Sequence, residues 1–351
     1  MKKDSLLPDR HPNSDFFIAD IFDSLPVKND RHTMEHPFFA LSTKKDTRTI
    51  KYEHNGITIK LSPSAEFGLP TMMDKDVLLY CGSQLMEAIN KGIKPSKTVR
   101  FSCHDLMVTT NRHTNDVAYS QLRNAFERLA GCLVTTNIKT NTIEKTEGFH
   151  LIENYKVIKG SHEKKRMVQV EVTVSDWFYN SLLGGEVLTI NRDYFRLRKT
   201  LERRLYEIAR KFCGKQPQCS MGLDTLKDKC GSRSDLNKFR FQLRKIIASD
   251  LKEQHFPDYQ LSISENDIVT FIRKGAKNSN PQGQLPLDDN IPAISHSTID
   301  KARNITIEAN TGWDFDVIHA EFTQALIEGF KPNNVNGAFI GFVKKKVVSA
   351  P

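Results

Sequence analysis

The stretch Leu236–Leu251, LNKFRFQLRKIIASDL, has the apolar periodicity of a single amphipathic helix. Its apolar side chains recur at helical spacing and predict one buried face. The residues of this face are Leu236, Phe239, Leu243, Ile246 and Ile247. At 100° per residue, the opposite face is polar and basic. It consists of Asn237, Lys238, Phe241, Arg244 and Lys245.

The segments on either side of this helix predict a helix-turn-helix. Gly222–Gly231 (GLDTLKDKCG) is expected to form a short helix that ends on a glycine, and Arg233 lies in the turn that follows. A short helix, a turn and a longer helix with a basic outer face is the helix-turn-helix order. Two strands, Tyr259–Ile263 and Asp267–Ile272, would then complete a winged helix over residues 186–274. The alternative is that the basic face is only a solvated surface.

The helix expected at Lys199–Phe212 (KTLERRLYEIARKF) adds positive charge just before this unit. Nine basic residues lie between Arg192 and Lys215, against three acidic ones. Helical periodicity predicts an outer stripe made of Lys199, Arg203, Tyr206 and Arg210. Phosphate contacts dominate the affinity of proteins for DNA. We therefore expect four cations to contact the DNA backbone: Arg198, Lys199, Arg203 and Arg210.

The composition agrees with a nucleic-acid-binding protein of two or three globular domains. The 351 residues include 51 Lys and Arg against 42 Asp and Glu, a net charge of +9 that favours a polyanionic partner. No apolar run approaches the roughly 20 residues that a membrane helix needs. The first residues contain two lysines but no apolar segment of a secretory signal, so we expect a cytoplasmic protein. The six cysteines form no C-x-x-C pair, which favours reduced thiols.

The first half of the chain has a similar order of elements. Helices are predicted at Asp74–Asn90, at Ser102–Thr109 with Ser102 as its cap, and at Asp116–Ala130 with Asp116 as its cap. Strands are predicted at Cys132–Asn141, His150–Ile158 and Arg166–Val174, and a final helix contains Trp177, Phe178 and Leu182. The expected fold class is therefore α+β, with tandem winged-helix domains. Because the outer face of the third helix is nearly neutral, the second domain should carry most of the DNA binding.

The two ends of the chain differ from these domains. The expected N-terminal arm contains apolar anchors at Asp15–Leu25 and Met34–Leu41 and a hairpin at Thr49–Leu61, whose Asn55-Gly56 pair suits a tight turn. Near the C-terminus, Asp316–Phe330 is expected to form a helix that Asn333–Gly337 ends. This tail either docks on a partner or on DNA, or caps the preceding domain. The predicted division is 1–66 arm, 67–185 first winged helix, 186–274 second winged helix, 275–297 linker and 298–351 helical C-terminal module.

Motifs for catalysis are missing from the sequence. There is no glycine-rich P-loop, and no His-x-His pair or histidine-rich triad accompanies a tyrosine, which argues against a nicking enzyme that uses Tyr194 or Tyr206. Several aspartates have the spacing of helix caps and exposed faces: Asp74, Asp76, Asp224 and Asp228. Cys213, Cys219 and Cys230 lack the spacing of metal ligands. We expect no catalytic residue, no metal and no cofactor.

Three stretches resemble the plasmid replication initiator protein A (RepA) family: MEHPFFAL at Met34–Leu41, GLPTMMDKDVLLYCGSQL at Gly68–Leu85 and WFYNSLLGG at Trp177–Gly185. The resemblance covers about residues 15–275. It implies similarity to iteron-binding Rep proteins with tandem winged helices. It further implies recognition of direct repeats in double-stranded plasmid origin DNA, local strand opening, recruitment of a host initiator and helicase, and a balance of monomers and homodimers. Gly68–Leu85 would then serve fold and assembly, not base reading.

In this hypothesis the helix Leu236–Leu251 lies in the major groove of DNA. Its exposed side chains would reach bases or phosphates, with Phe241 available for a thymine methyl group. The predicted DNA-binding residues of the second domain are Arg233, Asn237, Lys238, Phe241, Arg244 and Lys245. Two alternatives stay open: a transcriptional repressor with the same fold, and a nicking replication enzyme.

Overall fold

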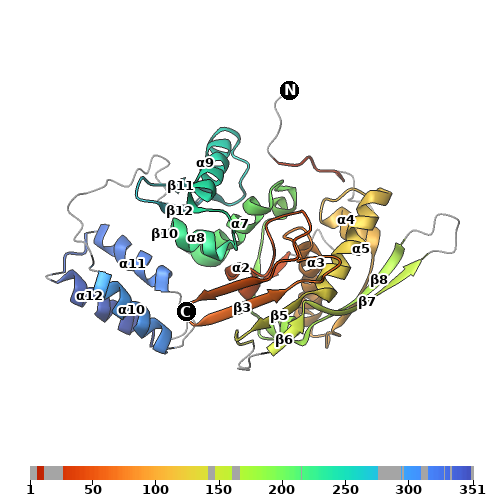
Figure 1. Ribbon diagram of the computed structural model, residues 1–351, viewed down its shortest axis with the longest axis horizontal. Helices are drawn as coiled ribbons and strands as arrows, with labels where there is room; N and C mark the ends of the chain where they lie inside the picture. Colours follow the sequence, from red (N-terminus) through yellow and green to blue (C-terminus); the bar gives the residue numbers. More distant parts are fainter. Residues whose placement is uncertain are drawn as a thin grey trace. The chain divides into compact units, whose positions relative to one another are not determined.

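The computed structural model shows a mixed α/β chain that divides into two compact units (Figure 1). It describes residues 6–11, 27–140, 147–159, 167–214, 216–275, 294, 296–309, 315–327, 329–332 and 334–348. The first unit contains Met1–Tyr52, Ile57–Lys211 and Lys227–Pro257, and the second contains Glu53–Gly56, Phe212–Leu226 and Asp258–Pro351. Within the described residues, no helix combines the length and apolarity needed to cross a membrane.

The first half of the chain forms the predicted helices and two predicted strands, Ile152–Lys159 and Met167–Val174, together with a strand, Thr98–Ser102, that was not predicted. The elements are α3 (Lys75–Asn90), β4 (Thr98–Ser102), α4 (Cys103–Thr109), α5 (Asp116–Gly131), β7 (Ile152–Lys159), β8 (Met167–Val174) and α6 (Asp176–Leu183). The three strands form an antiparallel sheet in the order β4-β8-β7. Ser102 is the N-cap residue of α4, as predicted, whereas the predicted cap of α5 is wrong by one residue. Asn115, not Asp116, caps α5 by accepting from the Ala118 amide at 3.0 Å, and Ser102 makes no side-chain cap bond.

A second sheet of the first half contains the predicted hairpin. Its strands are β2 (Ile50–His54), β3 (Ile57–Ser62), β5 (Leu133–Thr136) and β6 (Glu147–His150), in the order β2-β3-β5-β6. Asn55 and Gly56 have φ values of 48° and 76°. A tight primed turn needs positive φ at both central positions, so the hairpin prediction is confirmed. The strand predicted from Cys132 to Asn141 is shorter than expected, because β5 ends at Thr136.

The second half repeats the element order of the first. It contains β9 (Val187–Thr189), a 3-10 helix η2 (Arg192–Arg196), α7 (Thr200–Cys213), β10 (Gln218–Gly222), α8 (Leu223–Lys229), α9 (Leu236–Glu253), β11 (Tyr259–Ile263) and β12 (Ile268–Arg273). Its sheet has the order β10-β12-β11, so in both halves the strand before the short helix pairs with the last strand. Equivalent positions lie 120 residues apart: strand starts at 98 and 218, short-helix starts at 103 and 223, left-handed turn residues at 111 and 231, and helix caps at 115 and 235.

The stretch 34–41 of the predicted arm packs into the core of the first unit. Phe38 and Phe39 are buried in one apolar cluster with Trp177 and Phe178. The rings of Phe38 and Trp177 lie 5.2 Å apart, and a Cβ at Gly82 would stand 3.2 Å from Phe178. The three stretches that carry the family resemblance therefore meet in space. Upstream, β1 (Lys28–Asp30) pairs with β9 and leads into α2 (Arg31–Glu35). The predicted anchor at 15–25 lies outside the described residues.

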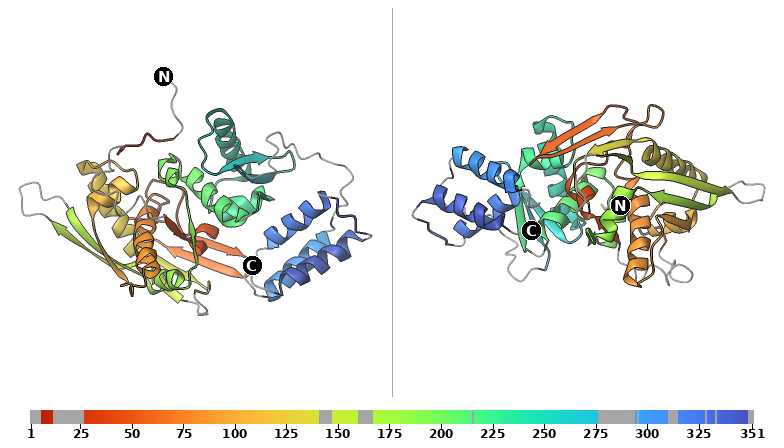
Figure 2. Two further views of the ribbon diagram at one scale, coloured as in Figure 1. Left: turned by 180° about the vertical axis from the view of Figure 1, so that it is seen from behind. Right: turned by 90° about the horizontal axis from the view of Figure 1, so that it is seen from below.

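The C-terminal region of the second unit is helical. Its helices are α10 (His296–Ala309), α11 (Phe315–Ile327) and α12 (Val335–Lys346), drawn in blue in Figure 2. They share an apolar core that includes Ile318, Phe322 and Phe339. Gln218 of β10 donates to Gln324 of α11 at 2.9 Å, which favours the expectation of a helical cap on the preceding elements. Asn334 caps α12 by accepting from the Gly337 amide. The predicted break at 333–337 is therefore the start of another helix.

A buried network of charges joins α7 to α3 in the first unit. The Glu207 carboxylate is fully buried and lies 2.8 Å from the ammonium of Lys75, which is 1% exposed. Arg204 and the Tyr194 hydroxyl also contact Glu207, at 3.2 and 2.9 Å. Burial lowers the pKa of Lys75, and the carboxylate of Glu207 opposes that shift. The ion pair therefore joins α3 to α7 through two fully buried side chains.

A second buried pair corrects two predictions from the sequence. Arg203 is 3% exposed on its side chain and pairs with Asp76 at 2.8 Å, and Tyr206 is fully buried. The predicted outer stripe on α7 is thus wrong for Arg203 and Tyr206, because α7 is covered on nearly all sides. Asp74 and Asp76 are buried as well, and Arg128 binds Asp74 at 2.7 Å. Asp74 is the N-cap residue of α3, as a helix cap was predicted, but the exposed face predicted for these aspartates is wrong, because both carboxylates form ion pairs inside the first unit.

Lys75→Met should destabilise the protein strongly, because it leaves the buried Glu207 carboxylate without its ammonium partner. Removing one partner of a buried ion pair costs about 3–5 kcal/mol. Chemical denaturation of wild type, Lys75→Met, Glu207→Gln and the double variant would measure this loss and the coupling between the two residues. The double variant should be more stable than Lys75→Met. Simple addition of the two single losses would contradict the coupling.

Candidate nucleic-acid interface

Helix α9 is fixed at both ends by local interactions. Asp235 caps its start by accepting from the Lys238 amide at 2.7 Å. At its end, Gln254 adopts a left-handed conformation with φ of 47°, and its amide donates to the Asp250 carbonyl. The buried face carries Phe239, Leu243, Ile246, Ile247 and Asp250. The apolar face predicted from the sequence is therefore confirmed at all positions except Leu236, which is half-buried.

The exposed side of α9 consists of two adjacent stripes. The outer stripe contains Asn237, Phe241 and Arg244, and Phe241 is 68% exposed. Helical geometry places Lys238, Gln242 and Lys245 about one third of a turn away on the same side. Arg240 donates a hydrogen bond to the Asn237 side chain. The Arg244 side chain, by contrast, makes no hydrogen bond or ion pair with any residue that the structure describes.

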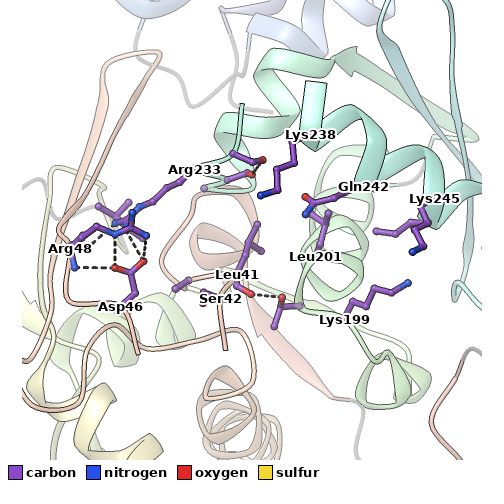
Figure 3. Close-up of a pocket in the computed structure, with 17 residues that line it drawn as sticks. Leu41, Ser42, Asp46, Arg48, Lys199, Leu201, Arg233, Lys238, Gln242 and Lys245 are labelled. Atoms are coloured by element: carbon purple, nitrogen blue, oxygen red, sulfur yellow. Dashed lines mark hydrogen bonds and ion pairs between the residues drawn. The ribbon is translucent and has the colours of Figure 1, made fainter. Parts of the chain in front are cut away.

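A pocket of about 580 Å³ lies beside the second stripe (Figure 3). Lys238, Gln242 and Lys245 line it from α9, Lys199 and Thr200 from the start of α7, and Arg48 from the segment before β2. All of these residues belong to the first unit. The charged lining residues are Arg48, Lys199, Arg233, Lys238 and Lys245 against the single carboxylate of Asp46. The pocket is therefore strongly cationic.

Asp46 binds two of these arginines. Arg48 donates to its carboxylate at 3.0 and 2.9 Å, and Arg233 does so at 2.7 Å. Arg233 also donates to the carbonyls of Arg48 and Thr49. The hydrogen bonds from Arg48 hold the pKa of Asp46 well below its ordinary value, although partial burial opposes them. Asp46 thus stays ionised and fixes both guanidinium groups at the wall of the pocket (Figure 3).

The structure distributes the predicted DNA-binding residues over different environments. Arg198 is exposed but donates to the Leu6 carbonyl, and Arg210 is half-buried and donates to the Thr189 carbonyl. Arg203 is buried in the pair with Asp76. Many of the basic side chains around α7 therefore bind groups of the protein itself. The remaining predicted residues, Lys199 and Arg233 together with the α9 side chains, lie on or beside the pocket.

Arg48 and Gln242 are among the lining residues that were not predicted from the sequence. Arg48 lies about 190 residues before α9 in the chain, and no local pattern connects it to that helix. Gln242 carries no charge, although its spacing of four residues from Lys238 indicates a shared stripe. The i, i+4, i+7 spacing of Lys238, Gln242 and Lys245 is therefore the sequence pattern from which Gln242 could have been predicted to line the pocket.

Comparison with known proteins places the chain in a family. Residues 28–261 match the model of the family described as replication initiator protein A. A putative replication protein from Wigglesworthia glossinidia brevipalpis is 35% identical over 263 residues, which cover 74% of this chain and 94% of that protein. The chain belongs to the replication initiator protein A family.

Solved structures with a similar chain course are more distant. Domains 2 and 3 of RctB align with a TM-score of 0.48 at 14% identity, over 67% of this chain and 94% of the other. The Pi initiator protein, solved in complex with iteron DNA, aligns with a TM-score of 0.42 at 15% identity, over 67% of this chain and all of the other.

Gly231→Ala should distort the turn before α9. Gly231 has φ of +67°, and an added Cβ would stand 2.7 Å from the Cβ of Pro37. Left-handed strain and overpacking together should cost about 2–4 kcal/mol. Gly92→Ala is a matched control, because Gly92 has φ of +69° and no atom within 4 Å of an added Cβ. Thermal and urea unfolding should show a loss of about 1 kcal/mol for this control. Equal losses in the two variants would contradict a role for the Pro37 contact.

Proposed function

We propose that this protein initiates plasmid replication by binding repeated sites in double-stranded origin DNA. Family membership supports the role in replication. The observation that carries the DNA contact is the outer stripe of α9, where Arg244 and the exposed ring of Phe241 face away from the core. A single exposed apolar side chain is ordinary on a protein surface, so the case for a partner rests on the position of Phe241 beside Asn237 and Arg244 on one helix face. A major groove accepts one α-helix with such a surface.

The proposal includes tandem winged-helix domains at 67–185 and 186–274. The repeated element order and the matching sheet orders, β4-β8-β7 and β10-β12-β11, support it. In that fold the longer helix after the turn reads the groove, and here this helix is α5 in the first domain and α9 in the second. The exposed residues of α5 include Val117, Gln121 and Arg123, which give little net charge. We assign the main DNA contact to the second domain.

Within α9 we assign base contacts to the outer stripe. Arg244 can donate two hydrogen bonds to guanine, Asn237 can pair with adenine, and Phe241 can contact a thymine methyl group. Lys238 and Lys245 flank this stripe and can reach phosphates. Arg198 and Arg210 are proposed only as peripheral backbone contacts, because each already binds a carbonyl of the protein.

The proposal extends to steps that follow DNA binding: opening of the origin, recruitment of a host initiator and helicase, and a balance of monomers and homodimers. These steps come from the family resemblance. We also propose a non-enzymatic protein. Tyr194 and Tyr206 are fully buried, and burial beside Glu207 raises the pKa of Tyr194 well above its ordinary value. Such hydroxyls are poor nucleophiles for a DNA strand, so the absence of a covalent tyrosine–DNA adduct on supercoiled origin DNA is expected.

A complementation experiment separates the initiator from a repressor of the same fold. A plasmid that carries the origin repeats but lacks this gene should fail to replicate, and supply of the protein from a second replicon should restore it. Replication without the protein, accompanied by repression of a promoter next to the repeats, would favour the repressor.

Arg244→Ala should weaken binding to the specific site by about 1–3 kcal/mol and relax specificity at one base pair. The physical reason is the loss of a bidentate contact with a base edge. Fluorescence anisotropy with an origin duplex and a random duplex would measure both affinities. The control is Lys94→Ala, which removes an exposed cation of the first half and should change neither of the two affinities. An equal loss on both duplexes would show that Arg244 contacts only phosphate.

A further inference from the structure

The cationic pocket beside α9 contains side chains from three separate parts of the chain. Arg48 comes from the segment before β2, Lys199 from the start of α7, and Lys238 and Lys245 from α9. We propose that this pocket binds the sugar–phosphate backbone of the DNA strand beside the groove that α9 enters. This phosphate subsite rests on the proposed function and deepens it. It divides α9 into a base-reading stripe and a backbone-binding stripe.

The charge balance of the pocket requires an anion from outside the protein. Asp46 is already shared by Arg48 and Arg233, and Lys199 is paired with Glu202 at 2.8 Å. Lys238 and Lys245 have no carboxylate partner among the described residues. Cations that line one concave surface reinforce each other's potential and attract polyanions. The two unpaired ammonium groups are therefore the strongest anion-binding points of the pocket.

The spacing of these groups suits a stretch of backbone. Lys238 and Lys245 are seven residues apart, which corresponds to a rise of about 10 Å along α9. One DNA strand carries about three phosphates over about 10 Å of the DNA helix axis. Hydroxyl and amide donors also contact phosphate oxygens in DNA complexes. The pocket supplies such donors in the Gln242 side chain and in the hydrogen-bonded hydroxyl pair of Ser232 and Ser234, whereas the Ser42 and Thr200 hydroxyls already donate to backbone carbonyls.

The lining also indicates which part of a nucleic acid enters the pocket. Proteins that hold single-stranded bases or free nucleotides stack them on aromatic side chains. Among the described residues that line this pocket, none is Phe, Tyr, Trp or His. The exposed aromatic residue of α9, Phe241, belongs to the other stripe. The chemistry therefore favours the charged backbone of a duplex over an unstacked base.

Asp46 has a positioning role in this proposal. Its carboxylate holds Arg48 and Arg233 at the wall of the pocket, and Arg233 is further fixed by the carbonyls of Arg48 and Thr49. Through these contacts the segment before the hairpin is tied to the turn that precedes α9. A part of the chain far from the helix-turn-helix thus contributes a cation to the proposed DNA surface.

The test is the salt dependence of binding for a triple variant, Arg48→Gln/Lys238→Gln/Lys245→Gln, in the full-length chain. These three side chains are exposed, and thermal unfolding will verify that the fold is kept. Each lost phosphate contact lowers the slope of log affinity against log salt by about 0.9. The slope should therefore fall by about 2–3 on origin and random duplexes alike, and the ratio of the two affinities should not change.

The matched control is Lys60→Gln/Lys91→Gln/Lys94→Gln, which removes the same charge from exposed positions outside the pocket. Its slope should stay close to that of the wild type. If the wild type binds duplex DNA and the triple pocket variant has the same slope as the control, the phosphate subsite is excluded while the proposed function stands. If the wild type itself has no salt-dependent affinity for duplex DNA, the proposed function fails.

A second measurement distinguishes whether the pocket binds the DNA backbone or a free phosphate compound. Inorganic pyrophosphate, tested by thermal shift, should stabilise the wild type slightly more than the pocket variant, because the variant lacks three of the cations that attract an anion. Clear stabilisation of the wild type alone, together with an unchanged DNA slope in the variant, would overturn the assignment to DNA.

Discussion

The fully buried carboxylate of Glu207 is a constraint on which the packing of the first unit depends. A charge without water or partners costs several kcal/mol, so folding must bring its partners together. Its partners come from four elements. Arg204 lies on α7, as Glu207 does, while Lys75 belongs to α3, Tyr194 to the 3-10 helix η2 and Asn29 to β1. One side chain thereby determines how segments from the start, the first half and the second half of the chain pack.

The same constraint reaches the proposed DNA surface. Arg204 donates to the carbonyls of Thr33, Met34, Glu35 and Lys229 as well as to Glu207. Lys229 ends α8, and the turn at Gly231 follows it directly. The start of α9 and the wall of the cationic pocket are therefore supported by the buried network. Positive charge in this protein has two separate tasks, since buried arginines organise the interior while exposed lysines remain available to a ligand.

Local patterns in the sequence predicted most helices and strands, but they did not predict which charged side chains are buried and which are exposed. Periodicity identified α3, α5, α7 and α9, and Asn55-Gly56 identified the hairpin, because these features depend on near neighbours. Arg203 was expected outside since a helical wheel shows only one helix, and its partner Asp76 is 127 residues away. Arg48 was missed for the same reason. The charge runs of a basic protein cannot be divided into structural and ligand-binding residues until distant segments are placed.

We propose that the exposed face of α9 and the adjoining pocket bind duplex DNA at repeated origin sites. Footprinting of the purified protein on the upstream DNA of its own plasmid would reveal such binding. We expect regularly spaced protected segments, with protection in the major groove and on the neighbouring backbone, which disappear as salt is raised. A complete absence of protection at low salt, or protection that salt does not weaken, would rule out this mode of binding.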